Sequence, residues 1–306
     1  MHRSTKDLVF ILTSFFCFSM QLFAQNEFDV KKIPAGLTEN AEAVVRLDET
    51  IFSIEDVGHA KKERRLVVTI FNERGERKHL RFQEGYDKLN KLKKIEGTKY
   101  DAQGNVIAKL KSNEIKDIGV SSFGTDISDA RIKIASFDNQ QSVYPYTIEY
   151  SFEVLTENMM FYPVFYPCDE EFTSIEKATL VIVTLGNFSI RYKELNGISP
   201  VVKKQENGKN YYSWHVENVP AFEEEPYSPD FDKPFVITAP TEFEVEGYRG
   251  NISNWKDVGK FYFELNKGRD VLPDVVKAKV KNIVQSEKDV RARIEKLYEF
   301  LQAGTH

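Results

Sequence analysis

The segment Tyr146-Thr147-Ile148-Glu149-Tyr150-Ser151-Phe152-Glu153 alternates large apolar side chains with polar ones. Successive side chains of a strand point to opposite faces, so this pattern predicts a strand with one face on a core and one face in water. Residues 179–185 are apolar on both faces and predict a central strand that is covered on each side. The same period of two predicts further strands over residues 44–54, 65–71, 95–100, 106–110, 131–137, 188–192 and 211–216.

Turn residues separate these predicted strands. Glycine or asparagine, which tolerate a positive φ, occur within residues 73–76, 101–104, 196–197 and 207–208. We therefore expect neighbouring strands to pair as antiparallel hairpins. Many short strands between turns are typical of a β-sandwich. The predicted fold class is mainly β, as one antiparallel β-sandwich or two in series, followed by a short C-terminal α-helical segment.

The N-terminus has the pattern of a secretory signal peptide. Arg3 and Lys6 precede a mostly apolar stretch over residues 8–23, and Ala24 offers a small residue at the expected cleavage site. We expect residues 1–24 to be removed and the protein to be exported, to the periplasm or to the cell surface. The apolar stretch is short and holds several polar residues, so we expect no stable membrane insertion after cleavage.

The net charge limits the kinds of partner that the chain can bind, and its cysteine content limits how the fold can be stabilised. The formal net charge of −5 disfavours a nucleic-acid-binding surface. The basic run at residues 88–94 lacks interleaved aromatics and predicts a solvated loop or sheet edge. After signal cleavage Cys168 is the only cysteine, so the chain forms no internal disulfide and depends on buried apolar area.

An aromatic segment interrupts the strand pattern at residues 158–172, a candidate seam within a β-sandwich region that spans residues 25–240. Its prolines predict an extended connection. One interpretation packs its aromatics between the two sheets, and the other makes them a platform for sugar rings or a peptide. The candidate binding aromatics are Phe161, Tyr162, Phe165, Tyr166 and, on a predicted strand, Trp214.

Residues 221–240 are rich in Glu, Asp and Pro and predict a linker without regular structure. Their acidic spacing matches no calcium-loop motif. Three amphipathic helices are then expected within residues 250–306, and these helices either dock on the sandwich or await further chain. Their expected starts are Asn254 as a cap with Asp257 at the third position, Pro273 as a first residue, and Ser286 in a capping box with Asp289.

Two sets of segments carry a resemblance to a known arrangement of domains. They are residues 255–262, 268–270 and 291–302 at the C-terminal end, and residues 143–152, 212–218 and 225–227 in the β-rich part. The order of the first set resembles the entry into the transglutaminase-like domain of large exported bacterial proteins, in which a β-rich domain of unknown function, similar to the second set, precedes it. The resemblance implies that residues 250–306 begin a transglutaminase-like domain that is truncated here, and that the Cys-His-Asp catalytic set of that domain lies downstream.

The sequence itself offers no catalytic or metal-binding set. Cys168 lies in the β-rich part and does not match the family's nucleophile. His59, His79 and His215 have no second ligand at a zinc-binding spacing. No phosphate-binding loop, nucleophile elbow or dinucleotide fingerprint occurs, so we expect no cofactor and no metal.

The leading hypothesis is a non-catalytic, exported β-sandwich module that binds a protein or glycan and supports a downstream transglutaminase-like domain. Two alternatives remain open at this level. One is a hydrolase or acyltransferase that uses Cys168 or a set of dispersed carboxylates. The other is a self-contained periplasmic binding protein.

Overall fold

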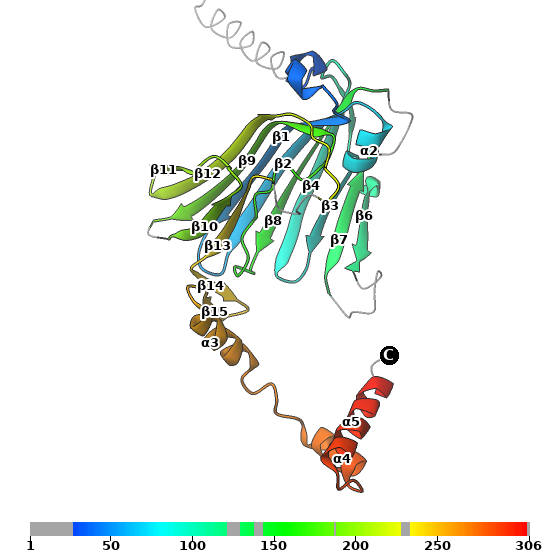
Figure 1. Ribbon diagram of the computed structural model, residues 1–306, viewed down its shortest axis with the longest axis vertical. Coiled ribbons are helices and arrows are strands. Elements are labelled where there is room, and N and C mark those ends of the chain that lie inside the picture. The colour runs from blue at the N-terminus through cyan, green and yellow to red at the C-terminus, as the bar shows by residue number, and fades with distance from the viewer. Residues whose placement is uncertain (1–26, 121–128, 138–142, 187, 228–232, 305–306) are drawn as a thin grey trace, which may run out of the picture. The chain divides into compact units, whose positions relative to one another are not determined.

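The computed structural model describes residues 27–120, 129–137, 143–186, 188–227 and 233–304 (Figure 1). The predicted signal peptide, residues 1–24, lies outside these ranges. The chain divides into two compact units, Met1–Ile252 and Ser253–His306. The first unit contains the strands that are described below, and the second contains three helices.

The largest sheet of the first unit has eight strands in the spatial order β11-β12-β9-β1-β2-β8-β4-β5. β9 lies between β12 and β1, which confirms the central strand predicted at residues 179–185. The strands span Ala43–Ile54 (β1), Ala60–Ile70 (β2), Asn90–Tyr100 (β4), Val106–Lys109 (β5), Tyr146–Thr156 (β8), Thr173–Leu185 (β9), Val202–Glu206 (β11) and Lys209–Val219 (β12).

One pair of strands departs from the predicted antiparallel pairing. β1 and β9 run parallel, with Ala43 opposite Thr173 and Ser53 opposite Val183, whereas the other neighbours in this sheet are antiparallel. Parallel neighbours need a long connection. Here residues 55–172, which include seven other strands, separate the two partners, and no local turn signal indicates such a pairing.

Three smaller sheets are also formed by the described residues of the first unit. They are β3-β7-β6 (Arg81–Tyr86, Arg131–Ser136 and Ile115–Gly119), β10-β13 (Ile190–Leu195 and Phe235–Pro240) and the hairpin β14-β15 (Glu242–Val245 and Tyr248–Asn251). Three short 3-10 helices span Val30–Lys32, Ala35–Leu37 and Ser112–Glu114. The predicted mainly β class with C-terminal helices is therefore confirmed.

The first two small sheets cover the large sheet (Figure 1). The Phe82 ring of β3 lies 5.4 Å from Tyr150 and 5.0 Å from Phe152 of β8, measured between centroids. The Tyr192 ring of β10 meets Trp214 of β12 edge-on at 5.3 Å. The second layer of the sandwich is therefore split in two. A buried hydrophobic cluster between the large sheet and the β3-β7-β6 sheet holds Ala43, Val68, Ile70, Leu80, Phe82, Ala135, Phe137, Tyr146, Ile148, Tyr150, Phe152 and Val154.

The turn predicted at residues 73–76 is instead the start of a helix, α2, which spans Glu73–His79. The Asn72 side chain accepts hydrogen bonds from the backbone N–H groups of Arg74 and Gly75, which caps the helix. A Cβ on Gly75 would lie 2.2 Å from the Glu42 carbonyl oxygen. Glycine is thus required for close packing of the helix on β1 and not for a positive φ.

The remaining turn and linker predictions have mixed outcomes. Residues 207–208 join the antiparallel pair β11 and β12, and residues 101–104 join β4 and β5, as predicted. Residues 196–197 have positive φ but connect β10 and β11, which lie in different sheets. Within the predicted linker 221–240, residues 228–232 lie outside the described residues, and the last six form β13 because they pair with β10.

The basic run at residues 88–94 includes the first residues of β4, which begins at Asn90. The short strand β5 pairs with Thr98–Tyr100 of β4 and not with this basic part. One side of this part of β4 is therefore a charged sheet edge, which is one of the two environments predicted for it. Charged edges disfavour pairing with other chains.

The second unit contains α3 (Trp255–Asn266), α4 (Asp274–Val284) and α5 (Val290–Gly304). Asn254 caps α3 by accepting from the Asp257 N–H, as predicted. α5 begins later than predicted, because Asp289 rather than Ser286 accepts the capping bond, from the Ala292 N–H. In the described part of the chain, no helix combines the length and apolar character needed to cross a bilayer.

Candidate binding cleft

A row of paired residues crosses the large sheet and shows where its inner face is left open. Trp214, Leu180, Thr50, Arg64 and Phe152 lie opposite one another on β12, β9, β1, β2 and β8. Residues paired in this way point to the same face. Trp214 is covered by β10 and Phe152 by β3. The middle of the row, Thr50 and Arg64, lines a cleft between the two covering sheets.

This cleft has a volume of about 830 Å³, which lies within the usual range of ligand sites. Its floor comes from β1, β2 and β8, and one wall comes from β3 and β7. The other wall is residues 158–167, the aromatic segment of the sequence. The inner face of the sandwich is therefore accessible between the two halves of its second layer.

The aromatic wall is held against β13 by backbone contacts. The Phe165 N–H donates to the Val236 carbonyl and the Val236 N–H donates to the Phe165 carbonyl, both at 2.9 Å. The Thr238 hydroxyl donates to the Pro163 carbonyl at 2.6 Å. Pro163 and Pro167 have no N–H to donate to a ladder, which keeps the segment an extended wall rather than a regular strand.

Ion pairs cover the floor of the cleft. Arg64 donates two hydrogen bonds of 2.8 Å to the two carboxylate oxygens of Asp48. Lys62 on the floor donates to Glu84 of the β3 wall at 2.5 Å. Burial works against the Arg64 charge, but the hydrogen bonds and negative charge of Asp48 outweigh it and raise the pKa of Arg64. The floor therefore presents polar groups whose charges are already matched.

The hydroxyl of Tyr162 is an exception to this matching, and a second is the Thr179 hydroxyl of β9. Tyr162 lines the cleft, its ring lies 5.2 Å from the Phe52 ring, and its side chain is almost entirely buried. Its hydroxyl has no hydrogen-bond partner among the described residues, and burial raises its pKa. Buried hydroxyl groups without a partner are rare in folded proteins, so this group indicates a place for a polar ligand atom or a water molecule.

The structure brings together four of the five predicted binding aromatics. Phe161, Tyr162, Phe165 and Tyr166 all line the cleft. Phe161 is 70% exposed, whereas Tyr162 and Phe165 are each 7% exposed. The packing interpretation therefore describes Tyr162 and Phe165, and Phe161 alone keeps the broad exposed ring of a platform.

Trp214, the fifth predicted aromatic, cannot contact a ligand in this structure. Its side chain is completely buried, and its indole N–H donates to Glu194 at 2.9 Å. The sequence shows an alternating strand at this position but does not show that β10 covers it. Its inclusion in the candidate site was therefore wrong.

Sequence reasoning missed the charged floor. The signal was present as charged residues at inward positions of β2, since Lys62 and Arg64 share a face with Val68 and Ile70. A charge on the core side of a strand requires a partner or an opening to water. Here Lys62 and Arg64 have both, because each has an acidic partner and each lines the cleft.

Cys168 does not have the environment of a nucleophile. The side chain is 6% exposed. Burial, together with the neighbouring charge of Asp169, raises the pKa of the Cys168 thiol to about 11. Catalytic cysteines have lowered pKa values and an accessible sulfur. Within the described ranges, moreover, no three His, Cys, Asp or Glu side chains are grouped closely enough to hold a metal ion.

A chemical measurement checks this state of Cys168. In a chain that lacks residues 1–24, we expect the native thiol to react with a disulfide reagent at pH 8 roughly a hundredfold more slowly than the urea-unfolded thiol, because the thiolate fraction falls with the higher pKa. The variant Cys168→Ser should bind ligands as the wild type does. Rapid native labelling, or a loss of binding in the variant, would contradict this assignment.

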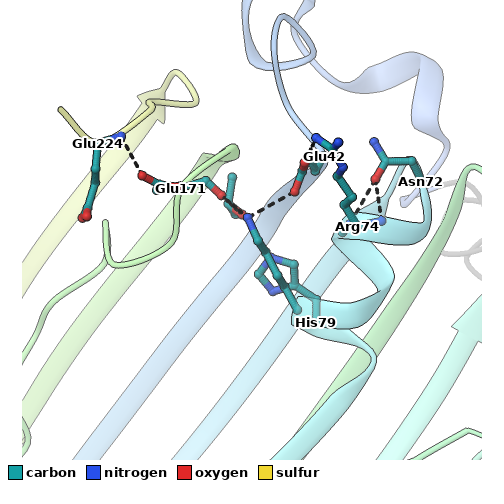
Figure 2. A network of polar contacts seen from close by, with 9 residues as sticks. Glu42, Asn72, Arg74, His79, Glu171 and Glu224 are labelled. Atoms are coloured by element: carbon teal, nitrogen blue, oxygen red, sulfur yellow. Dashed lines mark hydrogen bonds and ion pairs between the residues drawn. The ribbon is translucent and has the colours of Figure 1, made fainter. Parts of the chain in front are cut away.

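A second polar cluster lies at the end of the large sheet near α2 (Figure 2). The buried Glu42 pairs with Arg74 at 3.5 Å and with Lys78 at 3.1 Å, and Lys78 also donates to the Glu171 carbonyl. The Glu224 N–H donates to the Glu171 side chain at 2.8 Å. These bonds join segments that are far apart in the chain, so the cluster has a structural role.

Comparisons with known proteins agree with this architecture. Residues 56–223 match the model of a family described as a domain of unknown function with a solved structure (DUF3857). The crystal structure of a candidate protease from Parabacteroides distasonis aligns with a TM-score of 0.59 and 11% identity, over 86% of this chain and 50% of that one. At this identity the likeness concerns the fold alone.

A second solved structure is more distant. The M1 zinc metallopeptidase of Deinococcus radiodurans aligns with a TM-score of 0.30 and 7% identity, over 69% of this chain and 46% of that one. The chain thus spans about half the length of both solved structures. No curated protein matches the sequence.

Proposed function

We propose that this chain, which belongs to the DUF3857 family of domains of unknown function, has a non-catalytic binding module as its first unit. The ligand of this module, a protein or a glycan, occupies the cleft. The observation that carries this proposal is the cleft itself. It combines an exposed aromatic ring at Phe161, an unpartnered buried hydroxyl at Tyr162 and a polar floor around Arg64. A small number of placed polar groups beside apolar surface is typical of ligand sites.

The proposal includes a setting for the module. The signal-peptide pattern of residues 1–24 supports export to the periplasm or the cell surface. The resemblance of residues 255–262 and 291–302 to the entry of a transglutaminase-like domain supports a role as the module that precedes such a domain. In that arrangement the first unit binds the ligand, and the chemistry belongs to the domain that follows.

Catalysis by the first unit is not favoured by its geometry. The Cys168 thiol is buried with a raised pKa. The Asp48 carboxylate is engaged on both oxygens by Arg64, which leaves it poorly suited as a free acid or base. We therefore propose no second function.

The variant Phe161→Ala tests the site. In the wild type the exposed Phe161 ring would be buried against the ligand, and the variant lacks this apolar contact. We therefore expect about tenfold weaker binding by the variant, which corresponds to about 1.4 kcal/mol. The probes are a printed array of bacterial-envelope oligosaccharides and a phage-displayed library of random hexapeptides. Ligands retained by the wild type are then titrated against the variant.

The matched control is Tyr227→Ala, which removes a fully exposed aromatic at a site outside the cleft. This control should bind as the wild type does. If neither probe set is retained by the wild type, or if both variants bind equally well, the cleft is not a ligand site and the proposal is wrong.

A further inference from the structure

Both walls of the cleft present the edge of an extended chain. β3 is the outer strand of its sheet, and among the described residues no strand pairs with its other side. The aromatic wall pairs with β13 on one side through Phe165. An unpaired strand edge is a template for adding another strand. The question is which backbone groups point into the cleft.

On β3 the answer follows from the alternation of an antiparallel ladder. The Val120 N–H donates to the Ala130 carbonyl at 2.9 Å, so the backbone groups of Ala130 point toward β6. Alternate residues of a strand point to opposite sides. The backbone groups of Arg131, Lys133 and Ala135 therefore point toward β3, where they face those of Tyr86, Glu84 and Phe82.

It follows that the N–H and C=O groups of Gln83 and Gly85 point to the open edge of β3. Gly85 lines the cleft. A Cβ at this position would meet only the Arg131 carbonyl oxygen, at 3.9 Å, and its φ is not in the positive range, so the fold itself does not require glycine there. A methyl side chain can therefore be added at this position without a clash, while the outward N–H is kept.

The same argument applies to the aromatic wall. Both backbone groups of Phe165 bond to Val236, so those of its neighbour Val164 point away from β13. Val164 also lines the cleft, and its side chain is 57% exposed. Outward-pointing amide groups therefore border the cleft on both of its walls, at Gly85 and at Val164.

These groups favour a peptide over a glycan. Stacking on sugar rings requires exposed ring faces, and Phe161 alone offers a broad one, since Tyr162 and Phe165 are buried. Backbone amides arranged at strand spacing match another extended peptide. The matched ion pair of Asp48 and Arg64 would leave an added charge without a partner, so inward-facing hydroxyl or amide side chains suit the floor.

We propose that the cleft binds an extended peptide of about six residues, which pairs with the open edge of β3 through the backbone of Gln83 and Gly85 and directs hydroxyl or amide side chains to the floor at every second position. The inserted strand lies between the two halves of the second layer. This inference rests on the proposed binding function and specifies its ligand.

The test uses the hexapeptide library described above and the purified chain. Peptides that the wild type retains are synthesised with a fluorophore, and their dissociation constants are measured by fluorescence polarisation. The decisive variant is Gly85→Pro, because proline removes the outward N–H but leaves the bonds of β3 to β7 in place. We expect at least tenfold weaker binding by this variant.

Two matched controls accompany it. Gly85→Ala keeps the N–H and should bind within twofold of the wild type. Gln83→Pro removes the other outward N–H and should also weaken binding at least tenfold. With this second variant the test still stands if Gly85→Pro does not fold. On the peptide side, N-methylation at alternate residues should abolish binding in one register and leave it unchanged in the other.

The outcomes separate this inference from the proposed function. If Phe161→Ala weakens binding but both proline variants bind as the wild type does, the cleft binds ligands without strand pairing, and the inference fails alone. The inference also fails alone if the wild type retains only oligosaccharides. If no probe depends on Phe161, Gln83 or Gly85, both the inference and the proposed function are wrong.

Discussion

Replacement of Trp214 by alanine should lower the free energy of unfolding of the first unit by about 3–5 kcal/mol, as for other buried tryptophans. The side chain has no exposed surface, and its ring meets Tyr192 edge-on at 5.3 Å. Its N–H bond to Glu194 links the large sheet to β10. The truncation leaves a cavity at the contact between these layers. Urea unfolding followed by far-ultraviolet circular dichroism measures the loss.

The chain provides its own control, because its second tryptophan, Trp255, is 89% exposed. Trp255→Ala should change stability by no more than about 0.5 kcal/mol. Each variant also leaves a single tryptophan, so fluorescence reports one site at a time. A Trp214 variant as stable as the wild type would show that β10 does not pack on β12 as described.

The strands were predictable wherever one face of the strand is buried and the other is exposed to solvent. Along β8, Tyr146, Ile148, Tyr150 and Phe152 are all buried, in agreement with the alternation in the sequence. β9 is an interior strand of the sheet, as predicted, but it is not covered equally on both faces, because Leu180 and Ile182 are buried whereas Leu185 is 49% exposed. Where local side-chain chemistry and burial agree, as in β8, the period of two is sufficient.

Prediction failed where contacts distant in sequence decide the structure. Gly75 is read locally as a turn residue, yet it permits α2 to approach the Glu42 carbonyl oxygen. The parallel pairing of β1 with β9 joins segments that more than a hundred residues separate. No pattern within a single strand encodes its neighbour in the sheet.

The candidate site shows the same division. The aromatic segment was predictable from its composition, but its placement across from β3 depends on the order of the strands. In β1, a register shift between Val45 and Leu47 changes which residues face inward. Without this bulge, simple alternation would place Asp48 on the outer face. One extra residue thus puts the Asp48 carboxylate on the floor of the cleft.

Acid should destabilise the first unit through His79, by about 3 kcal/mol between pH 7 and pH 4. Burial and the charge of Lys78 lower the pKa of His79 from its ordinary value of 6.5 to about 4, although Glu42 opposes this shift. The imidazole Nε2 lies 3.1 Å from the Thr173 hydroxyl, beside the cluster around Glu42 (Figure 2). The folded protein therefore keeps this histidine neutral at a pH where the unfolded chain protonates it.

The direction of the effect follows from proton binding. Between pH 6.5 and pH 4 the unfolded state binds more protons at this site than the folded state, so stability falls as pH falls. The contribution of His79 is fully present above pH 6.5 and is lost progressively toward pH 4. In urea titrations at pH 7, 5.5 and 4, the wild type should therefore lose about 3 kcal/mol more than His79→Gln, which cannot take up the proton.

The control for this titration is His59→Gln. His59 is exposed and pairs with Asp56 at 2.9 Å, and this hydrogen bond raises the pKa of His59 instead of lowering it. An exposed pair of this kind contributes little to stability. The acid loss of His59→Gln should therefore match that of the wild type. If His79→Gln also matches the wild type at every pH, His79 is not held neutral by burial, and the packing of α2 against Thr173 is looser than the structure shows.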